Sequence, residues 1–154
     1  MKIFTFPHPI LRKKTKPVTD FSKIKEIAQE MEKIMEKNHG IGLAANQVGL
    51  DLSFFIAKPQ KKLYIVINPK IVEVSEEKEK MIEGCLSLPK ILANVERPKW
   101  VLLEAFNEKG KKVTLKAQGL LARVFLHESD HLNGILIIDR SKEIYKVSEA
   151  KDLI

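Results

Sequence analysis

The sequence predicts an α+β fold with one early helix, several mostly antiparallel strands and one later helix. Two stretches with apolar residues at helical spacing flank a middle region of short β-branched and apolar runs, and this arrangement predicts the fold. The length of 154 residues fits one domain, residues 1–154. With 44% hydrophobic and 31% charged residues, the composition is that of a globular protein rather than a disordered one.

The first helix is expected after an extended opening segment, because residues 7–18 contain three prolines. Asp20 is a candidate N-cap, and Gly40 and Gly42 are expected to stop the helix. Between them, apolar residues recur on one helical face, which predicts packing against the core. That face consists of Phe21, Ile24, Ile27, Met31, Ile34 and Met35.

The strands and the second helix follow in the remainder of the chain. Short apolar runs separated by turn residues are typical of strands. We expect them at residues 52–57, 63–68 and 71–74, with a hairpin formed by residues 100–106 and 113–115. The second helix is expected from Gly119 to about Asn133, with Gly134 as its stop. Residues 141–154 are polar and predict a short helix or a frayed end.

Composition excludes several classes of protein. No apolar run approaches the roughly 18 residues of a membrane span, and the start lacks the apolar core of a signal peptide, so we expect a cytoplasmic protein. Cys85 is the single cysteine, which excludes an internal disulfide and leaves a free thiol. The net charge of +7 comes from basic residues interleaved with Glu, which favours solubility over attraction to RNA or to a nucleic-acid-rich machine, and no specific DNA partner is expected.

Residues 127–131 carry the pattern H-E-x-x-H within the second predicted helix. His127 and His131 lie about 40° apart around such a helix, so both rings project from one face and can bind one divalent metal ion. Glu128 lies on the same side, near a metal-bound water. Because apolar residues share this arc, Glu128 is expected to face the interior, where an unpaired carboxylate is costly. Two surface histidines and an ordinary helical Glu are the simpler alternative.

A catalytic site needs a third ligand, and the sequence offers several. The third histidine of a metzincin would fall at Ile137, so that pattern fails. Glu143 and Glu149 are available to a thermolysin-like site. Cys85 is the remaining candidate, as a thiolate whose pKa the metal would lower. An inert buried cysteine is the alternative for Cys85.

A third segment, residues 40–49, has two glycines followed by small residues. Such a pattern suggests close approach of the backbone to another group. The segment lacks the Gly-Lys-Ser/Thr ending of a phosphate loop, and a structural turn is the simpler interpretation. Gln47 could donate a hydrogen bond to an oxyanion.

Taken together, these three segments resemble the peptide deformylase family. The matching motifs are GIGLAANQ at residues 40–47, EGCLS at 83–87 and HESDH at 127–131, and the similarity covers residues 3 to 140. The resemblance implies mixed β-sheets packed around a central H-E-x-x-H helix. It also implies one divalent metal ion bound by Cys85, His127 and His131, with Fe²⁺ in the cell and Zn²⁺, Ni²⁺ or Co²⁺ as substitutes.

The resemblance further implies an activity, namely removal of the formyl group from the N-terminal formyl-methionine of nascent polypeptides, with release of formate. A metal-bound hydroxide would attack the formyl carbon, and Glu128 would act as general acid and base. The oxyanion would be met by the metal, the Gln47 side chain and the Leu86 backbone N–H. The ribosome, where nascent chains emerge, is the implied partner.

The same resemblance implies a substrate site. Ile41 and Gly42 would hold the peptide backbone. Leu120 and Val124 would line the pocket for the methionine side chain. Arg123 is expected at the rim of that pocket, because it falls off the apolar arc of the helix.

Two further positions carry weaker expectations. Asp130 is expected either to orient a ligand histidine without binding the metal itself or to be an ordinary residue on the helix surface. Leu126 stands where the family usually has Gln.

Two other functions compete with a deformylase. One is an H-E-x-x-H zinc peptidase, which would keep its metal when Cys85 is substituted. The other is a catalytically silent, basic, ribosome-associated binding protein, whose ribosome binding would survive Glu128→Ala.

Overall fold

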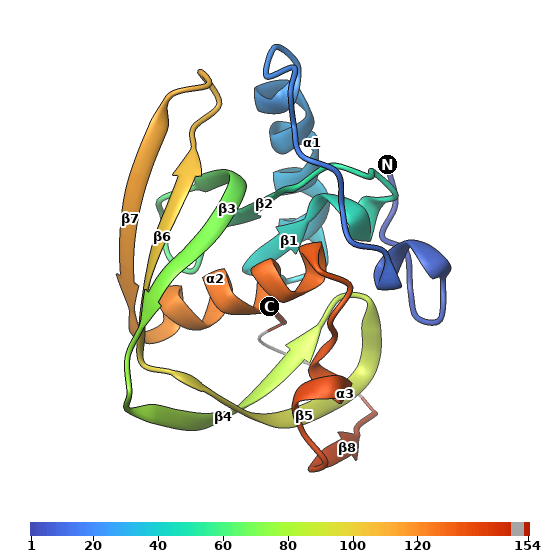
Figure 1. The fold of residues 1–154 in the computed structure, drawn as a ribbon. Coiled ribbons are helices and arrows are strands. Elements are labelled where there is room, and N and C mark those ends of the chain that lie inside the picture. The colour runs from blue at the N-terminus through green and yellow to red at the C-terminus, as the bar shows by residue number, and fades with distance from the viewer. Residues whose placement is uncertain (149–152) are drawn as a thin grey trace.

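The computed structural model describes residues 1–148 and 153–154. Its strands form a five-stranded sheet in the order β1-β2-β3-β6-β7 and a three-stranded sheet in the order β4-β5-β8 (Figure 1). The strands are β1 Gly42–Ala44, β2 Phe54–Ala57, β3 Tyr64–Val74, β4 Lys78–Cys85, β5 Leu88–Pro98, β6 Trp100–Phe106, β7 Lys112–Gln118 and β8 Ile144–Lys146. The helices are α1 Ile24–Lys37, α2 Gly119–Leu132 and α3 Ile137–Arg140, with 3₁₀ turns η1 Pro9–Arg12 and η2 Ala45–Val48. All neighbouring strands pair antiparallel, which confirms the predicted fold class.

Helices α1 and α2 cover opposite faces of the five-stranded sheet around β2. Phe54 and Ile56 belong to the core under α1, whereas Phe55 and Ala57 belong to the core under α2. Successive side chains of a strand point to opposite faces, so a strand covered on both sides is buried at every position. This accounts for the continuous apolar sequence of β2.

Helix α2 lies between the two sheets (Figure 1). It contacts β1, β2, β6 and β7 of the larger sheet and β5 of the smaller one. As a result, every residue from Ala122 to Leu132 is buried, including the polar ones. The bounds of this helix agree with the prediction, and Gly134, which follows it, has a φ of 74°.

Some predicted elements are wrong in detail. Residues 63–68 and 71–74 form the single strand β3, and the irregular register between Ile67 and Lys70 accommodates Pro69 within it. Helix α1 begins at Ile24, because Asp20 accepts hydrogen bonds from Ser22 in a turn before the helix.

Strands β1, β4, β5 and β8 have no counterpart in the prediction, which placed a turn over β1 and a short helix or frayed end over β8. The first five residues of β4 are exposed and mostly charged, so their sequence is typical of a surface loop. They form a strand because β5 lies alongside them. β8 in turn pairs with β5 and completes the three-stranded sheet.

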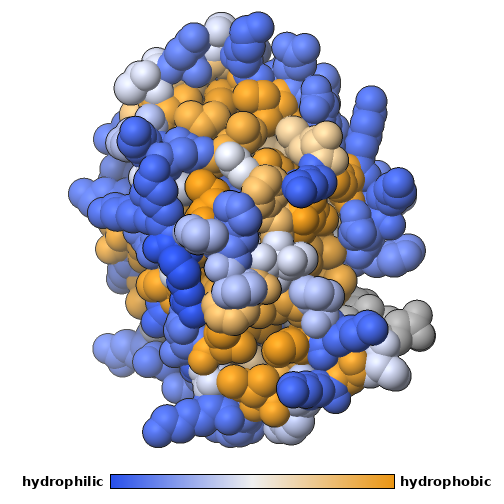
Figure 2. Space-filling view, turned by 90° about the vertical axis from the view of Figure 1, so that its right-hand side faces the viewer, coloured by the Kyte–Doolittle hydropathy of each residue, from blue (hydrophilic) through white to orange (hydrophobic). Residues whose placement is uncertain are grey.

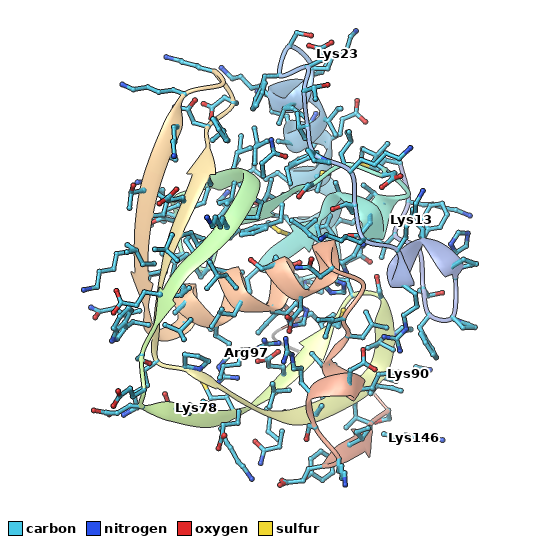
Figure 3. The ribbon with its side chains drawn as sticks, in the orientation of Figure 1. Lys13, Lys23, Lys78, Lys90, Arg97 and Lys146 are labelled. Carbon is cyan, nitrogen blue, oxygen red and sulfur yellow. The ribbon has the colours of Figure 1, made fainter. Side chains whose placement is uncertain are left out.

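Many of the lysines lie at the surface of the fold. Hydrophilic side chains surround the hydrophobic atoms visible on the face in Figure 2. The labelled lysines in Figure 3 lie at the periphery, namely Lys13, Lys23, Lys78, Lys90 and Lys146. Among the described residues, no helix combines the length and the apolar character that crossing a membrane requires.

Candidate metal centre and active site

Cys85, His127 and His131 lie together at the centre of the molecule. Cys85 ends β4, while the two histidines face it from successive turns of α2. The Cys85 Sγ and His131 Nε2 atoms are 3.2 Å apart, as are the two histidine Nε2 atoms. One ligand atom from each of the three residues lies within 4.8 Å of the others. Tetrahedral bonds to zinc place neighbouring ligand atoms roughly 3.3–3.6 Å apart, so the cluster fits a divalent ion of this kind.

The protonation of the cluster also suits a metal site. Burial, together with the nearby Glu128, raises the pKa of the Cys85 thiol to about 12. A bound cation reverses this preference, because a coordinated thiol loses its proton. Burial and the neighbouring His127 hold the pKa of His131 well below its usual range, so this ring is neutral, the form that binds metal.

Glu128 lies beside the cluster and is fully buried, as its place on the apolar arc predicts. Its Oε2 atom is 4.0 Å from His127 Nε2, and neither carboxylate oxygen has a hydrogen-bond partner among the described residues. Burial raises the pKa of this carboxyl well above its usual range. A buried carboxylate without a partner is costly, so the site is built for a group that meets these oxygens.

Gly42 allows β1 to approach this carboxylate. A Cβ atom at Gly42 would lie 2.5 Å from Glu128 Oε2 and 2.7 Å from Val124 Cγ1, too close for either neighbour. Val124 is itself fully buried beneath the glycine. The position therefore requires glycine for space rather than for an unusual backbone angle.

Gln47 extends from η2 to the cluster of Cys85, His127 and His131. Its Nε2 atom donates to Ser87 Oγ at 3.0 Å and lies 3.7 Å from Cys85 Sγ. Its Oε1 atom accepts the backbone N–H of Ala44 at 2.9 Å, which fixes the orientation of the amide. Leu86 follows Cys85 directly and is buried, so its backbone lies at the same centre.

Glu83 is the functional residue that sequence reasoning missed. His127 Nδ1 donates to Glu83 Oε1 at 2.8 Å, while Arg97 Nε and Arg123 Nη1 each donate to Glu83 Oε2 at 2.6 Å. Burial raises the pKa of Glu83, but the bonds from His127 and Arg97 outweigh it and hold this pKa well below its usual range. No local pattern indicated this role, because β4 was not predicted as a strand and its register shifts between Gly84 and Cys85.

Arg123 lines the cavity described below, but it is buried rather than exposed off the apolar arc. Arg123 is only 4% exposed, and besides Glu83 its guanidinium donates to the carbonyls of Val95 and Glu79. Because both sides of α2 are covered by sheets, even its polar face is buried. Arg123 therefore joins α2 to β4 and β5.

Asp130 supports His127 through an intermediate rather than directly. Its carboxylate accepts from Arg97 at 3.0 Å and from Arg140 at 2.7 Å. Arg97, labelled in Figure 3, lies between α2 and the β4–β5 layer and carries the connection on to Glu83. Leu126 packs into the hydrophobic core under α2.

The third ligand of a thermolysin-like site is not supplied by Glu143. Its carboxylate is bonded to Lys80 and Asn94 at the surface. Glu149 lies outside the described residues. Among the residues that the structure describes, Cys85 is the potential third ligand that lies with the two histidines.

A cavity of about 400 Å³ opens beside this centre. Ile41, Leu120 and Arg123 line it together with Met81 and Ile82 of β4. Leu120 is 42% exposed at its mouth. Of the two residues expected to line the methionine pocket, Leu120 lines this cavity together with Arg123, whereas Val124 does not and lies behind Gly42.

The sequence and the fold both match known proteins. The family model for polypeptide deformylase matches residues 1–147. Peptide deformylase of Thermotoga maritima is 43% identical over 154 residues, covering 99% of this chain and 90% of the relative, and that of Borreliella burgdorferi is 41% identical over 149 residues, covering 95% and 90%. The crystal structure of peptide deformylase from Thermotoga maritima superposes with a TM-score of 0.89 at 44% identity, over 92% of this chain and 97% of that chain. The chain therefore belongs to the polypeptide deformylase family.

Proposed function

We propose that Cys85, His127 and His131 hold one divalent metal ion and that Glu128 is the general acid and base of the reaction. As a polypeptide deformylase, the protein is a metal-dependent hydrolase that removes the N-formyl group from newly synthesised polypeptides. One observation carries the assignment of residues: a buried Cys-His-His cluster lies beside a buried carboxylate that has no partner among the described residues.

The donor set limits the choice of metal. A thiolate with two imidazoles suits Fe, Zn, Co or Ni, and we propose Fe²⁺ as the ion in the cell. When bound, such an ion activates water and polarises a carbonyl oxygen. Glu83 holds the Nδ1 proton of His127, which leaves Nε2 free to act as a ligand.

Glu128 moves the proton. It accepts a proton from the water that attacks the formyl carbon, and it delivers that proton to the amine nitrogen as the C–N bond breaks. Burial raises the pKa of this carboxyl, which favours its protonated form, the form that delivers the proton to the amine. The products are formate and a free amino terminus.

The Gln47 amide and the Leu86 backbone N–H stabilise the negative charge on the formyl oxygen. The contacts of Gln47 to Ala44 and Ser87 orient its amide before substrate arrives. Donors that are already in place act without a cost of reorganisation at the moment of reaction.

The substrate is an N-formyl-methionyl nascent peptide. The backbone of Ile41 and Gly42 binds the peptide, and the methionine side chain enters the cavity bordered by Leu120 and Arg123. Because such chains emerge from the ribosome, we propose that the protein acts in the cytoplasm near the ribosomal exit. The scattered basic residues suit this setting without a dedicated nucleic-acid site.

Formate release from a short formyl-methionyl peptide tests this function. The protein is prepared without oxygen, or loaded with Ni²⁺, and is compared with Glu128→Ala and with the control Glu26→Ala in α1. We expect Glu128→Ala to lose about 10²–10⁴-fold in kcat with unchanged metal content, because a general acid and base contributes that much. Cys85→Ser should lose the metal.

Other outcomes would overturn the proposal. Absence of formate from fully loaded protein removes the deformylase assignment for this substrate. Retention of metal by Cys85→Ser, with cleavage of unformylated peptides, supports a zinc peptidase. Ribosome binding by a parent protein without turnover, unchanged in Glu128→Ala, supports the silent binding protein.

A further inference from the structure

Two sheet edges face each other across the candidate active site. β1 is an edge strand of the five-stranded sheet, and β4 is an edge strand of the three-stranded sheet. Leu153 forms parallel bridges to Gly40, just before β1, and to Gly84 in β4. The last residue of the sequence lies beside α2 in Figure 1. The segment Leu153–Ile154 therefore occupies the space between the edges.

One peptide group of this segment spans the cleft. The backbone N–H of Ile41 donates to the carbonyl of Leu153 at 2.8 Å, and the N–H of Ile154 donates to the carbonyl of Gly84 at 3.3 Å. Both acceptor and donor in the segment belong to the same peptide unit. Exposed strand edges offer unpaired backbone groups of this kind to any extended chain.

The side chains fix the segment as well. Ile154 is 3% exposed and belongs to the hydrophobic core that includes Val124. It also borders the cavity assigned to the methionine side chain. Leu153 packs over Gly84, where a Cβ atom would lie 2.7 Å from Leu153 Cδ2. Ile154 thus forms part of the wall of that cavity, while Leu153 occupies the backbone N–H of Ile41 that the proposed function assigns to the substrate peptide.

We propose that Leu153–Ile154 is an internal competitor of the substrate and must leave the cleft before a formylated peptide binds. That the segment competes with a formylated peptide rests on the proposed function. That it occupies the cleft does not. A tethered segment acts at a high effective concentration, so it lowers the apparent affinity for peptide. The apparent affinity for peptide equals the intrinsic affinity multiplied by the fraction of molecules whose cleft is open.

The first test needs no turnover. Amide hydrogen exchange at Ile41 is measured in the parent, in a variant lacking residues 153 and 154, and in the double variant Leu153→Asp/Ile154→Asp. We expect at least tenfold faster exchange at Ile41 in both variants, because its acceptor is removed. The control Ile144→Asp in β8 should leave this exchange unchanged. Unaltered exchange at Ile41 in the deletion variant overturns the proposal.

The second test uses the reaction. We expect the deletion variant to have a lower KM for a formyl-methionyl peptide and an unchanged kcat. A synthetic peptide with the sequence of residues 147–154 should inhibit the deletion variant competitively and slow exchange at Ile41. An unchanged KM, or a peptide that neither inhibits nor protects, overturns the proposal. If the protein releases no formate, the exchange measurements still decide whether the segment occupies the cleft.

Discussion

Two reactive side chains at this centre, His127 and Gln47, are oriented by neighbours. Glu83 holds His127, while Ser87 and Ala44 hold Gln47. Hydrogen bonds of this kind are required because an amide or imidazole that rotates no longer points at the metal or the substrate. The function of these residues therefore depends on the orientation of their side chains as well as on residue type.

Gln47→Leu tests the oxyanion role at this scale. We expect kcat to fall about 10²–10³-fold with metal content unchanged, because one donor to the developing negative charge is lost. Formate release and metal analysis measure the two quantities. The exposed Gln29→Leu in α1 is the control. A kcat equal to that of the parent would exclude Gln47 from the oxyanion site.

At the scale of elements, Glu83 joins β4 to α2. Glu83→Gln leaves Arg123 buried without its carboxylate partner and leaves Arg97 with Asp130 alone, so we expect a loss of about 3–5 kcal/mol in the free energy of unfolding. We also expect metal affinity to fall about 10–100-fold, because His127 loses its partner. Denaturant unfolding of metal-free protein and metal titration measure these effects. The exposed Glu79→Gln on the same strand should change neither, and equal stability of Glu83→Gln and the parent would contradict the argument.

Phe125 joins the same helix to the larger sheet. Its ring centroid lies 5.7 Å from that of Phe55 and 5.5 Å from that of Tyr64, and the residue is fully buried. Phe125→Ala should reduce the free energy of unfolding by about 3–5 kcal/mol, because a cavity replaces the ring. Chemical denaturation measures the loss, with the half-exposed Leu120→Ala in α2 as control. A loss no larger than that of the control would show that the core closes around the gap.

At the scale of the whole molecule, an ion pair connects two elements far apart in the sequence, η1 and α3. Arg12 in η1 binds Asp139 in α3. Although burial raises the pKa of Asp139, the bonds from Arg12 and from the Leu136 N–H outweigh it and lower this pKa below its usual 3.8. A depressed pKa in the folded state stabilises the fold above the unfolded pKa, and this contribution disappears as pH falls through the folded value.

Asp139→Asn tests this linkage. We expect the variant to melt below the parent at pH 6, the difference to shrink as pH falls below 3.8, and the difference to vanish once pH is below the lowered folded pKa, where the parent carboxyl is also neutral. Thermal unfolding of both proteins across this range provides the measurement. Glu30→Gln, an exposed change in α1, is the control. A difference in melting temperature that stays constant down to the lowest pH would show that the charge of Asp139 is not responsible.

The local features of the protein were predictable because they depend on residue spacing. The H-E-x-x-H pattern places two histidines and an inward-facing Glu128 on one side of a helix, and the helix bounds follow from Gly119 and Gly134. The hairpin of β6 and β7 follows from two β-branched runs around a glycine-containing loop. The approach of Cys85 to the histidines came from the family resemblance rather than from spacing.

Only the tertiary structure determined the remaining contacts. Cys85 and His131 are 46 residues apart, and no local period relates them. The bonds of Glu83 to His127, Arg97 and Arg123 depend on β4, β5 and α2 meeting, and β4 itself has the sequence of a charged loop until β5 pairs with it. Helical periodicity identifies the face that carries the histidines, but burial of the opposite face requires a second sheet, which α2 by itself does not encode.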